Sequence, residues 1–147
     1  MKRIFYLIAL IGLFLFLSGC EKVTRTEPYI TSFQQDPNIL KSQSDFTILY
    51  KVVNPKDSPD ELYLKVSIPK ESNDCIELVD YRLTNGKVPL GEIKSKSEKF
   101  FYTNFRTTEK SESRECNIQF DLYTSAQADT SVYGVVIKVD IAQQTRA

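Results

Sequence analysis

Alternation of apolar and polar residues with a period of two is the feature of this sequence that most restricts its fold. Leu62–Ile68 and Cys116–Leu122 both show it. Successive side chains of a β-strand point to opposite faces, so this period predicts half-buried strands rather than helices. Seven segments fit the description: Tyr29–Phe33, Phe46–Val53, Leu62–Ile68, Cys75–Leu83, Lys99–Phe105, Cys116–Leu122 and Val132–Ile141.

Turn-forming residues separate these segments. Asn54–Asp60 joins the second and third, Pro69 ends the third, and Asn85-Gly86 follows the fourth. No convincing helical period extends over ten or more residues beyond the N-terminal segment. We therefore predict an all-β fold, an antiparallel β-sandwich of about seven strands with immunoglobulin-like or transthyretin-like architecture. A small closed barrel is the main alternative, because it also reads as evenly spaced strands.

The N-terminal segment has the features of an export signal. Lys2 and Arg3 precede an apolar run, Ile4–Leu17, and the small residues Ser18 and Gly19 follow it. The run is shorter than the roughly 20 residues that a membrane-spanning helix needs. We interpret it as a cleaved signal peptide.

The tetrapeptide Leu17-Ser18-Gly19-Cys20 resembles the lipobox of bacterial lipoproteins. The resemblance implies that a diacylglyceryl group is attached to Cys20, that a peptidase cuts before it, and that the new amino terminus is often acylated. Two or three acyl chains give stable membrane attachment, which one chain does not. The expected organisation is a signal peptide at 1–19, a lipidated cysteine and short tether at 20–27, and a β-sandwich domain at 28–147.

The lipobox also implies a location in the bacterial cell envelope. In enteric-type Gram-negative bacteria, an aspartate after the cysteine resembles an inner-membrane retention signal, and here that position is Glu21. We therefore expect the outer membrane, facing the periplasm, in a Gram-negative host, and the outer face of the cell membrane in a Gram-positive one. The tether from Glu21 to Glu27 reaches about 25 Å when fully extended, so the domain stays near its membrane.

Charge gives no sign of a nucleic-acid partner. The chain has 19 cationic and 19 anionic side chains. Cleavage removes the cations Lys2 and Arg3 and no anions, so the mature chain has a net charge of about −2. There is no basic footprint of the kind that nucleic-acid binding requires.

Histidine is absent from all 147 residues. Its absence excludes imidazole general bases, Ser-His-Asp and Cys-His nucleophiles, and histidine-ligated zinc or haem. A pair of carboxyl groups for glycan hydrolysis needs a cleft, for which a small sandwich has little room. We therefore expect no enzymatic activity and no cofactor.

Acidic residues gather in two places, and calcium is the metal that such groups suit best. Neither group has the spacing of a calcium-binding loop, so we interpret both as solvated turns and expect no metal ion. The groups are Glu71, Asp74, Glu77 and Asp80, and Asp57, Asp60 and Glu61.

Cys75 and Cys116 form an even pair once Cys20 is assigned to lipid. Export favours a disulfide between them, and each lies at the start of a predicted strand. Closing a loop of roughly 40 residues would stabilise the domain by about 4 kcal/mol. Free buried thiols and a redox-active pair are the alternatives, but the cysteines lack CxxC spacing.

The run Phe100–Phe105 is aromatic on both faces of a predicted strand. If Phe101 and Phe105 point into the core, Phe100 and Tyr102 point outward and form a candidate partner surface. We favour the alternative that this is a central strand covered on both sides, or that the loop at 106–115 folds over it.

Together these features predict a membrane-anchored, non-catalytic lipoprotein that acts as a binding or assembly module of the cell envelope. Its expected partners are the membrane, through the lipid on Cys20, and another envelope protein. Two alternatives remain: a carrier of a small hydrophobic ligand, which requires an internal cavity, and a plasmid- or phage-encoded surface exclusion or immunity lipoprotein.

Overall fold

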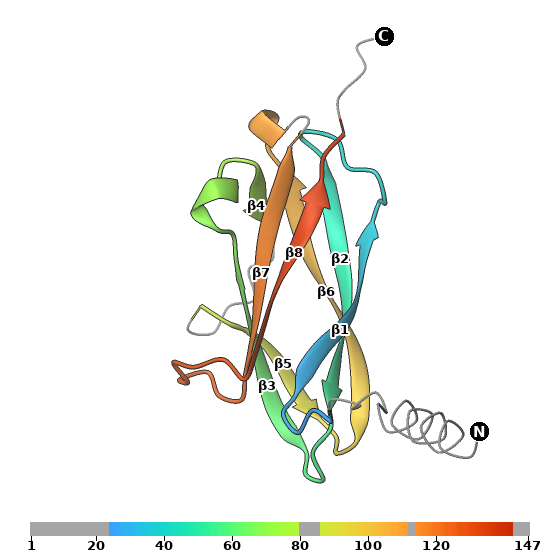
Figure 1. Ribbon diagram of the computed structural model, residues 1–147, viewed down its shortest axis with the longest axis vertical. Helices are drawn as coiled ribbons and strands as arrows, with labels where there is room; N and C mark the ends of the chain where they lie inside the picture. Colours follow the sequence, from blue (N-terminus) through green and yellow to red (C-terminus); the bar gives the residue numbers. More distant parts are fainter. Residues whose placement is uncertain (1–23, 80–85, 112–113, 143–147) are drawn as a thin grey trace, which may run out of the picture.

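The computed structural model describes residues 24–79, 86–111 and 114–142, which form two four-stranded antiparallel sheets (Figure 1). The first sheet has the order β1-β2-β6-β4, with β1 at Tyr29–Asp36, β2 at Asp45–Asn54, β6 at Ser97–Thr107 and β4 at Ile76–Leu78. The second has the order β5-β3-β7-β8, with β5 at Val88–Ile93, β3 at Asp60–Ser67, β7 at Glu115–Tyr123 and β8 at Tyr133–Asp140. The predicted all-β sandwich is confirmed, and the closed barrel is excluded.

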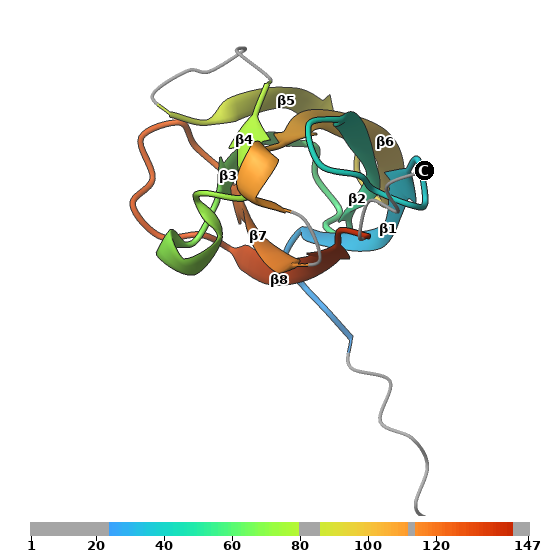
Figure 2. The ribbon, with the colours of Figure 1, turned by 90° about the horizontal axis from the view of Figure 1, so that it is seen from above.

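The strands of the two sheets enclose the centre of the molecule (Figure 2). Their inward side chains form the core there. Aromatic rings fill its centre. The ring of Phe120 in β7 lies 5.5 Å from that of Tyr50 in β2 and 6.3 Å from that of Phe105 in β6. Tilted and edge-on contacts of this kind are favourable beyond the area they bury. They join the two sheets through side chains of widely separated strands.

The sandwich has two ends of different character (Figure 1). At the end that we call the tether end, β1 begins and the β2–β3 and β5–β6 turns lie close together, at residues 55–59 and 94–96. At the opposite end, the disulfide end, are the β1–β2 loop at 37–44, the 3-10 helices η1 (Lys70–Ser72) and η2 (Glu109–Ser111), and the end of β8. The chain therefore enters the sandwich at the end opposite its disulfide.

The structure differs from the sequence expectation in the strands around residue 90. It has eight strands in the described residues, because Val88–Ile93 forms β5, a strand that the alternation did not indicate. The strand predicted at Cys75–Leu83 is represented by the three-residue β4, and residues 80–85 lie outside the described part. Gly91 has φ +76°, and the pairing of β5 with β3 shifts register beside it, which breaks the period of two.

The first strand contains a second irregularity. Ser32 has φ +57°, and the register between β1 and β2 shifts between Thr31 and Gln34. A bulge of this kind adds one residue, so that Ile30 and Phe33 both face the core although three positions separate them. The Phe33 ring lies 5.4 Å from that of Phe120.

Among the described residues, no helix has the length and apolar character required to cross a membrane. The predicted signal peptide at 1–19 and the lipidation site Cys20 lie outside the described residues.

Candidate interaction surface

The predicted cysteine pair is a disulfide in the structure. Cys75, directly before β4 of the first sheet, is joined to Cys116 in β7 of the second, and both side chains are fully buried. The bond therefore links the two sheets at the disulfide end. Beside it, Arg114 donates to Asp74 over 2.9 Å, so one of the predicted acidic turns is tied to the strand that follows η2. This disulfide supports the fold and presents no reactive thiol.

Alternate residues of β2 and β6 point away from the core and form the outer surface of the first sheet. Lys51 lies opposite Phe100, and Leu49 lies opposite Tyr102. We call these four residues the aromatic face. Phe100 is 59% exposed and Tyr102 is 53% exposed, whereas Leu49 and Lys51 are half-buried. The favoured expectation that this strand is covered on both sides, or by the loop at 106–115, is wrong, because Phe100 and Tyr102 are both more than half exposed.

Phe101 and Phe105 point toward the core, as predicted. Phe105 is fully buried and stacks on Phe46 at 5.3 Å between ring centroids, and Phe101 packs against the core beside Tyr50 at 6.1 Å. One strand thus contributes aromatic side chains to the core and to the surface at alternate positions. Large exposed aromatic side chains are rare on surfaces without a partner and are enriched at protein interfaces.

Ion pairs border the aromatic face at both ends. On the side of the tether end, Lys51 binds Glu98 at 3.0 Å, and its ammonium lies 5.8 Å from the centre of the Phe100 ring. On the other side, Arg106 donates to both carboxylate oxygens of Asp45, at 2.6 and 3.3 Å. These hydrogen bonds, together with the guanidinium charge, lower the pKa of Asp45. An apolar centre with a charged border is the usual anatomy of a protein-binding surface.

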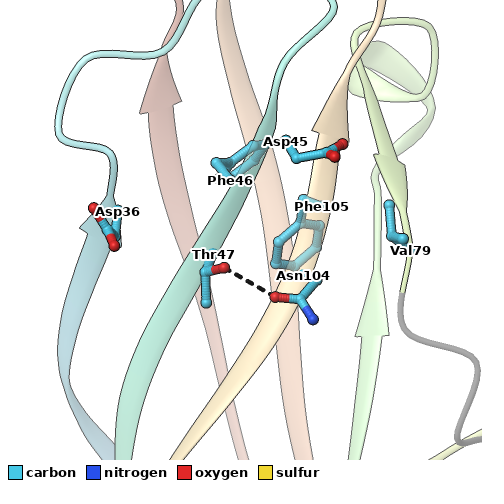
Figure 3. A pocket seen from close by; sticks show the side chains of 7 residues that line it. All are labelled: Asp36, Asp45, Phe46, Thr47, Val79, Asn104 and Phe105. Atoms are coloured by element: carbon cyan, nitrogen blue, oxygen red, sulfur yellow. Dashed lines mark hydrogen bonds between the residues drawn. The ribbon is translucent and has the colours of Figure 1, made fainter.

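A shallow hollow of about 340 Å³, lined by apolar as well as polar groups, lies on the same surface around Asn104 (Figure 3). We call it the polar hollow after the carboxylate, hydroxyl and amide groups that line it. It crosses the first sheet, and the hydrogen bond from Thr47 to Asn104, 2.9 Å long, forms part of its floor. The lining residues are Asp36, Asp45, Phe46, Thr47, Val79, Asn104 and Phe105. Polar groups that face outward beside an apolar patch give a partner places to hydrogen-bond as well as to pack.

The edge of β6 beside the aromatic face has few described neighbours. β4 pairs with β6 from Phe105 to Thr107, and the N–H of Val79 adds one more bond, to the Asn104 carbonyl at 3.0 Å. Within the ranges that the structure describes, the pairing along this edge of β6 does not continue from Asn104 toward Ser97.

The tether end holds a group that the sequence reasoning missed. The guanidinium of Arg25 lies over two neighbouring rings, 5.0 Å from the centre of Tyr29 and 5.1 Å from that of Tyr133. These two rings, one from β1 and one from β8, are themselves 6.5 Å apart. We call this arrangement the arginine clamp. Nothing in the local sequence indicates it, because Tyr133 comes from the far end of the chain.

An ion-pair network supports the arginine clamp. Glu27 binds Lys56 at 2.8 Å, and Lys56 also binds Asp60 at 3.0 Å. The hydrogen bond to Glu27, followed by the one to Asp60, raises the pKa of Lys56, which keeps it charged across the neutral range. Residues 24–27, which the sequence assigns to a tether, therefore contact the folded domain.

Two more of the predicted acidic residues, Asp57 and Glu61, make ordinary surface contacts. Glu61 accepts a hydrogen bond from the Tyr63 hydroxyl at 2.9 Å. Asp57 binds Lys96 at 3.2 Å, and no cluster of three or more metal-binding side chains occurs in the part of the chain that the structure describes. Asp80 lies outside that part.

No family model matches the sequence, and no curated protein matches it significantly. Several solved structures are similar in fold. A FixG-related protein from Vibrio parahaemolyticus aligns with a TM-score of 0.50 at 14% identity, over 80% of this chain and 97% of that one. Alpha-2-macroglobulin from Escherichia coli, from domain MG7 to the C-terminus, aligns with a TM-score of 0.51 at 12% identity, over 80% of this chain and 17% of that one.

A conjugative transposon lipoprotein from Bacteroides eggerthii aligns with a TM-score of 0.48 at 10% identity, over 78% of this chain and 97% of that one. At such identities, the likenesses to the first two structures show the β-sandwich fold and nothing more.

Proposed function

We propose that the protein is a membrane-anchored, non-catalytic lipoprotein that binds another protein of the bacterial cell envelope through the aromatic face. The observation that carries this proposal is the exposure of Phe100 and Tyr102 side by side on the outer surface of the first sheet. The lipobox resemblance at Leu17-Ser18-Gly19-Cys20 supplies the anchor. Removing two large aromatic side chains from water gives a favourable contribution to binding, of about 25 cal/mol for each Å² of apolar surface.

The chemistry of the exposed groups supports binding rather than catalysis. The chain has no histidine, so acid–base work would fall to carboxyl groups. Of the two carboxylates at the polar hollow, Asp45 is held by Arg106, whose hydrogen bonds lower its pKa and favour its charged form. A general acid requires a raised pKa, so this carboxylate is unsuited to that role.

The carrier alternative has no support in the described core. The space between the sheets is occupied by Phe33, Tyr50, Phe105 and Phe120, whose ring centroids lie 5.4 to 6.4 Å apart where they contact each other. The polar hollow opens on the outer surface instead. A small hydrophobic ligand would need an internal cavity lined by such side chains.

Site-specific crosslinking in the native membrane tests the proposal. With a photo-reactive residue at Thr31, on the neighbouring strand β1, we expect the lipidated protein to crosslink to one discrete envelope protein. The variant Phe100→Ser/Tyr102→Ser should lose at least about nine-tenths of this product, because interface aromatic side chains often contribute more than 1.4 kcal/mol, a tenfold change in affinity.

A matched control is Val136→Ser in β8, since Val136 is 51% exposed on the other sheet. This variant should crosslink like the wild type. If the double variant keeps the same product at wild-type yield, the aromatic face is not the binding surface.

Replacement of Cys20 tests the anchor. Cys20→Ala removes the acceptor of the acyl chains, so the protein should move from the membrane fraction to the soluble fraction, as measured by fractionation and immunoblotting. Glu21→Gln keeps the cysteine and should stay in the membrane fraction. A Cys20→Ala protein that remained membrane-bound would contradict the lipoprotein interpretation.

A further inference from the structure

The described structure fixes the point at which the chain enters the sandwich. The Arg25 guanidinium lies over the rings of Tyr29 and Tyr133, and Glu27 is held by Lys56. These contacts come from β1, β8 and the β2–β3 turn, so they tie residues 24–27 to the tether end from several directions. An arginine stacked on aromatic rings combines electrostatic attraction with packing.

The length of chain before Thr24 limits the distance to the anchor. Cys20 and Thr24 are four residues apart, and a fully extended chain spans at most about 14 Å over that length. β6 contains 11 residues and runs from the tether end toward the disulfide end. At about 3.3 Å for each residue, the disulfide end lies roughly 33 Å beyond the tether end.

We infer that the sandwich stands on its own membrane, with the tether end against the lipid headgroups and the disulfide end pointing away. This inference rests on the proposed lipid anchor at Cys20. The occupant of the tether end is thus the bilayer surface. The height of the aromatic face above the bilayer follows from this orientation. Counted from Ser97 at the rise of a strand, Phe100 lies about 10 Å from the tether end and Tyr102 about 17 Å.

Charge favours this end over the aromatic face as the lipid contact. Residues 24–29, 54–60 and 93–97 contain four cationic and three anionic side chains, and Lys94 and Lys96 in the β5–β6 turn are exposed. The outer surface of the first sheet contains more anions than cations: Asp36, Asp45, Glu77 and Glu98 against Lys51 and Arg106. Anionic lipids attract lysines and repel carboxylates, so lying on that sheet would be electrostatically less favourable.

The orientation restricts the partner of the aromatic face. A protein that contacts Phe100 and Tyr102 must reach within about 10 to 17 Å of the bilayer, by the same strand rise. A protein embedded in or anchored to the same membrane lies at that height, and any other partner must reach down to the bilayer surface.

Quenching of single fluorescent labels by headgroup-labelled lipid measures the orientation. The lipidated protein, reconstituted in phosphatidylcholine/phosphatidylglycerol vesicles, is labelled at Ser95→Cys at the tether end, Tyr102→Cys on the aromatic face, or Ile39→Cys in the β1–β2 loop. Ile39 is 70% exposed and Ser95 is also exposed. We expect quenching at 95 to be at least about threefold stronger than at 39, since their heights differ by about 30 Å, with 102 between them.

Two further variants test the cause of the orientation. A Gly-Ser insertion of about 20 residues before Thr24, with an r.m.s. span of about 25 Å, should bring the ratio of quenching at 95 to that at 39 close to one. Arg25→Ala should lower the ratio by weakening the arginine clamp, whereas Lys41→Ala, an exposed position in the β1–β2 loop, should leave it unchanged.

Vesicle flotation separates the two ways in which the inference can fail. Protein that floats with the vesicles but shows equal quenching at 95 and 39 overturns the orientation and leaves the anchor intact. Stronger quenching at 102 than at 95 also overturns it, because the domain would then lie on the aromatic face. Protein that does not float overturns the anchor, and with it the orientation that depends on the anchor.

Discussion

At the scale of single residues, buried polar groups hold the turns of the tether end together. Asn54 is fully buried at the end of β2, and its amide donates to the carbonyls of Ser58, at 2.9 Å, and Ile93, at 3.0 Å. Its oxygen accepts the N–H of Lys56 at 3.1 Å. One side chain therefore joins the β2–β3 turn to the β5–β6 turn. The sequence identifies Asn54 as a turn residue, but its contact with Ile93 depends on how the sheets pack.

Replacing this residue should weaken the fold measurably. Asn54→Ala leaves buried carbonyl and N–H groups without partners, each costing about 1 to 3 kcal/mol, so we expect a loss of about 2 to 3 kcal/mol in the free energy of unfolding. Urea denaturation followed by circular dichroism measures it. Asn38→Ala, at an exposed loop position, should change the value by less than about 0.5 kcal/mol. Equal midpoints for the two variants would contradict the assigned role of Asn54.

At the scale of strands, the sequence identifies a strand whose apolar and polar residues alternate without a break. It does not identify a strand in which that alternation is interrupted. β2, β3 and β7 keep the period of two, and the sequence identifies all three. In β5, Pro89 and Gly91 resemble turn residues, and the register shift beside Gly91 turns Ile93 inward where a strict period would place Glu92. Local pattern carries no information about a bulge that the partner strand helps to form.

The same limit applies to the candidate site. Alternation predicts that Phe100 and Tyr102 share one face of a strand, and the structure agrees. Their exposure depends on which elements cover that sheet, which is a property of the whole topology. The arginine clamp was beyond prediction for the same reason, because Arg25 and Tyr133 meet only when β1 and β8 lie beside each other.

The bulge in β5 gives a prediction at this scale. Gly91 has φ +76°, and a methyl group added there meets no atom within 4 Å, so the cost of Gly91→Ala is one of backbone conformation alone. Left-handed geometry costs a residue with a side chain about 1 to 2 kcal/mol, and we expect that loss of stability in urea denaturation. Glu92→Ala, an exposed neighbour in the same strand, serves as the control and should be close to neutral. A neutral Gly91→Ala would contradict the left-handed conformation assigned to this position.

At the scale of the whole molecule, the two ends of the sandwich are secured in different ways. The tether end is held by the arginine clamp and by the Glu27–Lys56–Asp60 ion pairs, which are non-covalent. The disulfide end is held by the covalent bond between Cys75 and Cys116, which joins the two sheets. Because the pKa of Lys56 is raised, the stabilisation from its charged form is fully present up to the usual lysine value of 10.5 and is lost only as the pH rises above it. Between the two ends, the aromatic core is the main connection between the sheets.

Reduction of the disulfide should therefore destabilise the molecule as a whole. The bond closes a loop with a sequence separation of 41 residues. The chain-entropy relation predicts that opening such a loop costs about 4 kcal/mol, a large fraction of the 5 to 15 kcal/mol by which domains are usually stable. The measurement is guanidinium denaturation of the Cys20→Ala chain, which avoids the acyl chains, with and without dithiothreitol.

The double variant Cys75→Ala/Cys116→Ala in the same background is the control. It should match the reduced protein and show no further response to the reductant. If the midpoint of the parent chain were the same under both conditions, the bond would not contribute to stability in solution, and the core alone would account for the association of the two sheets.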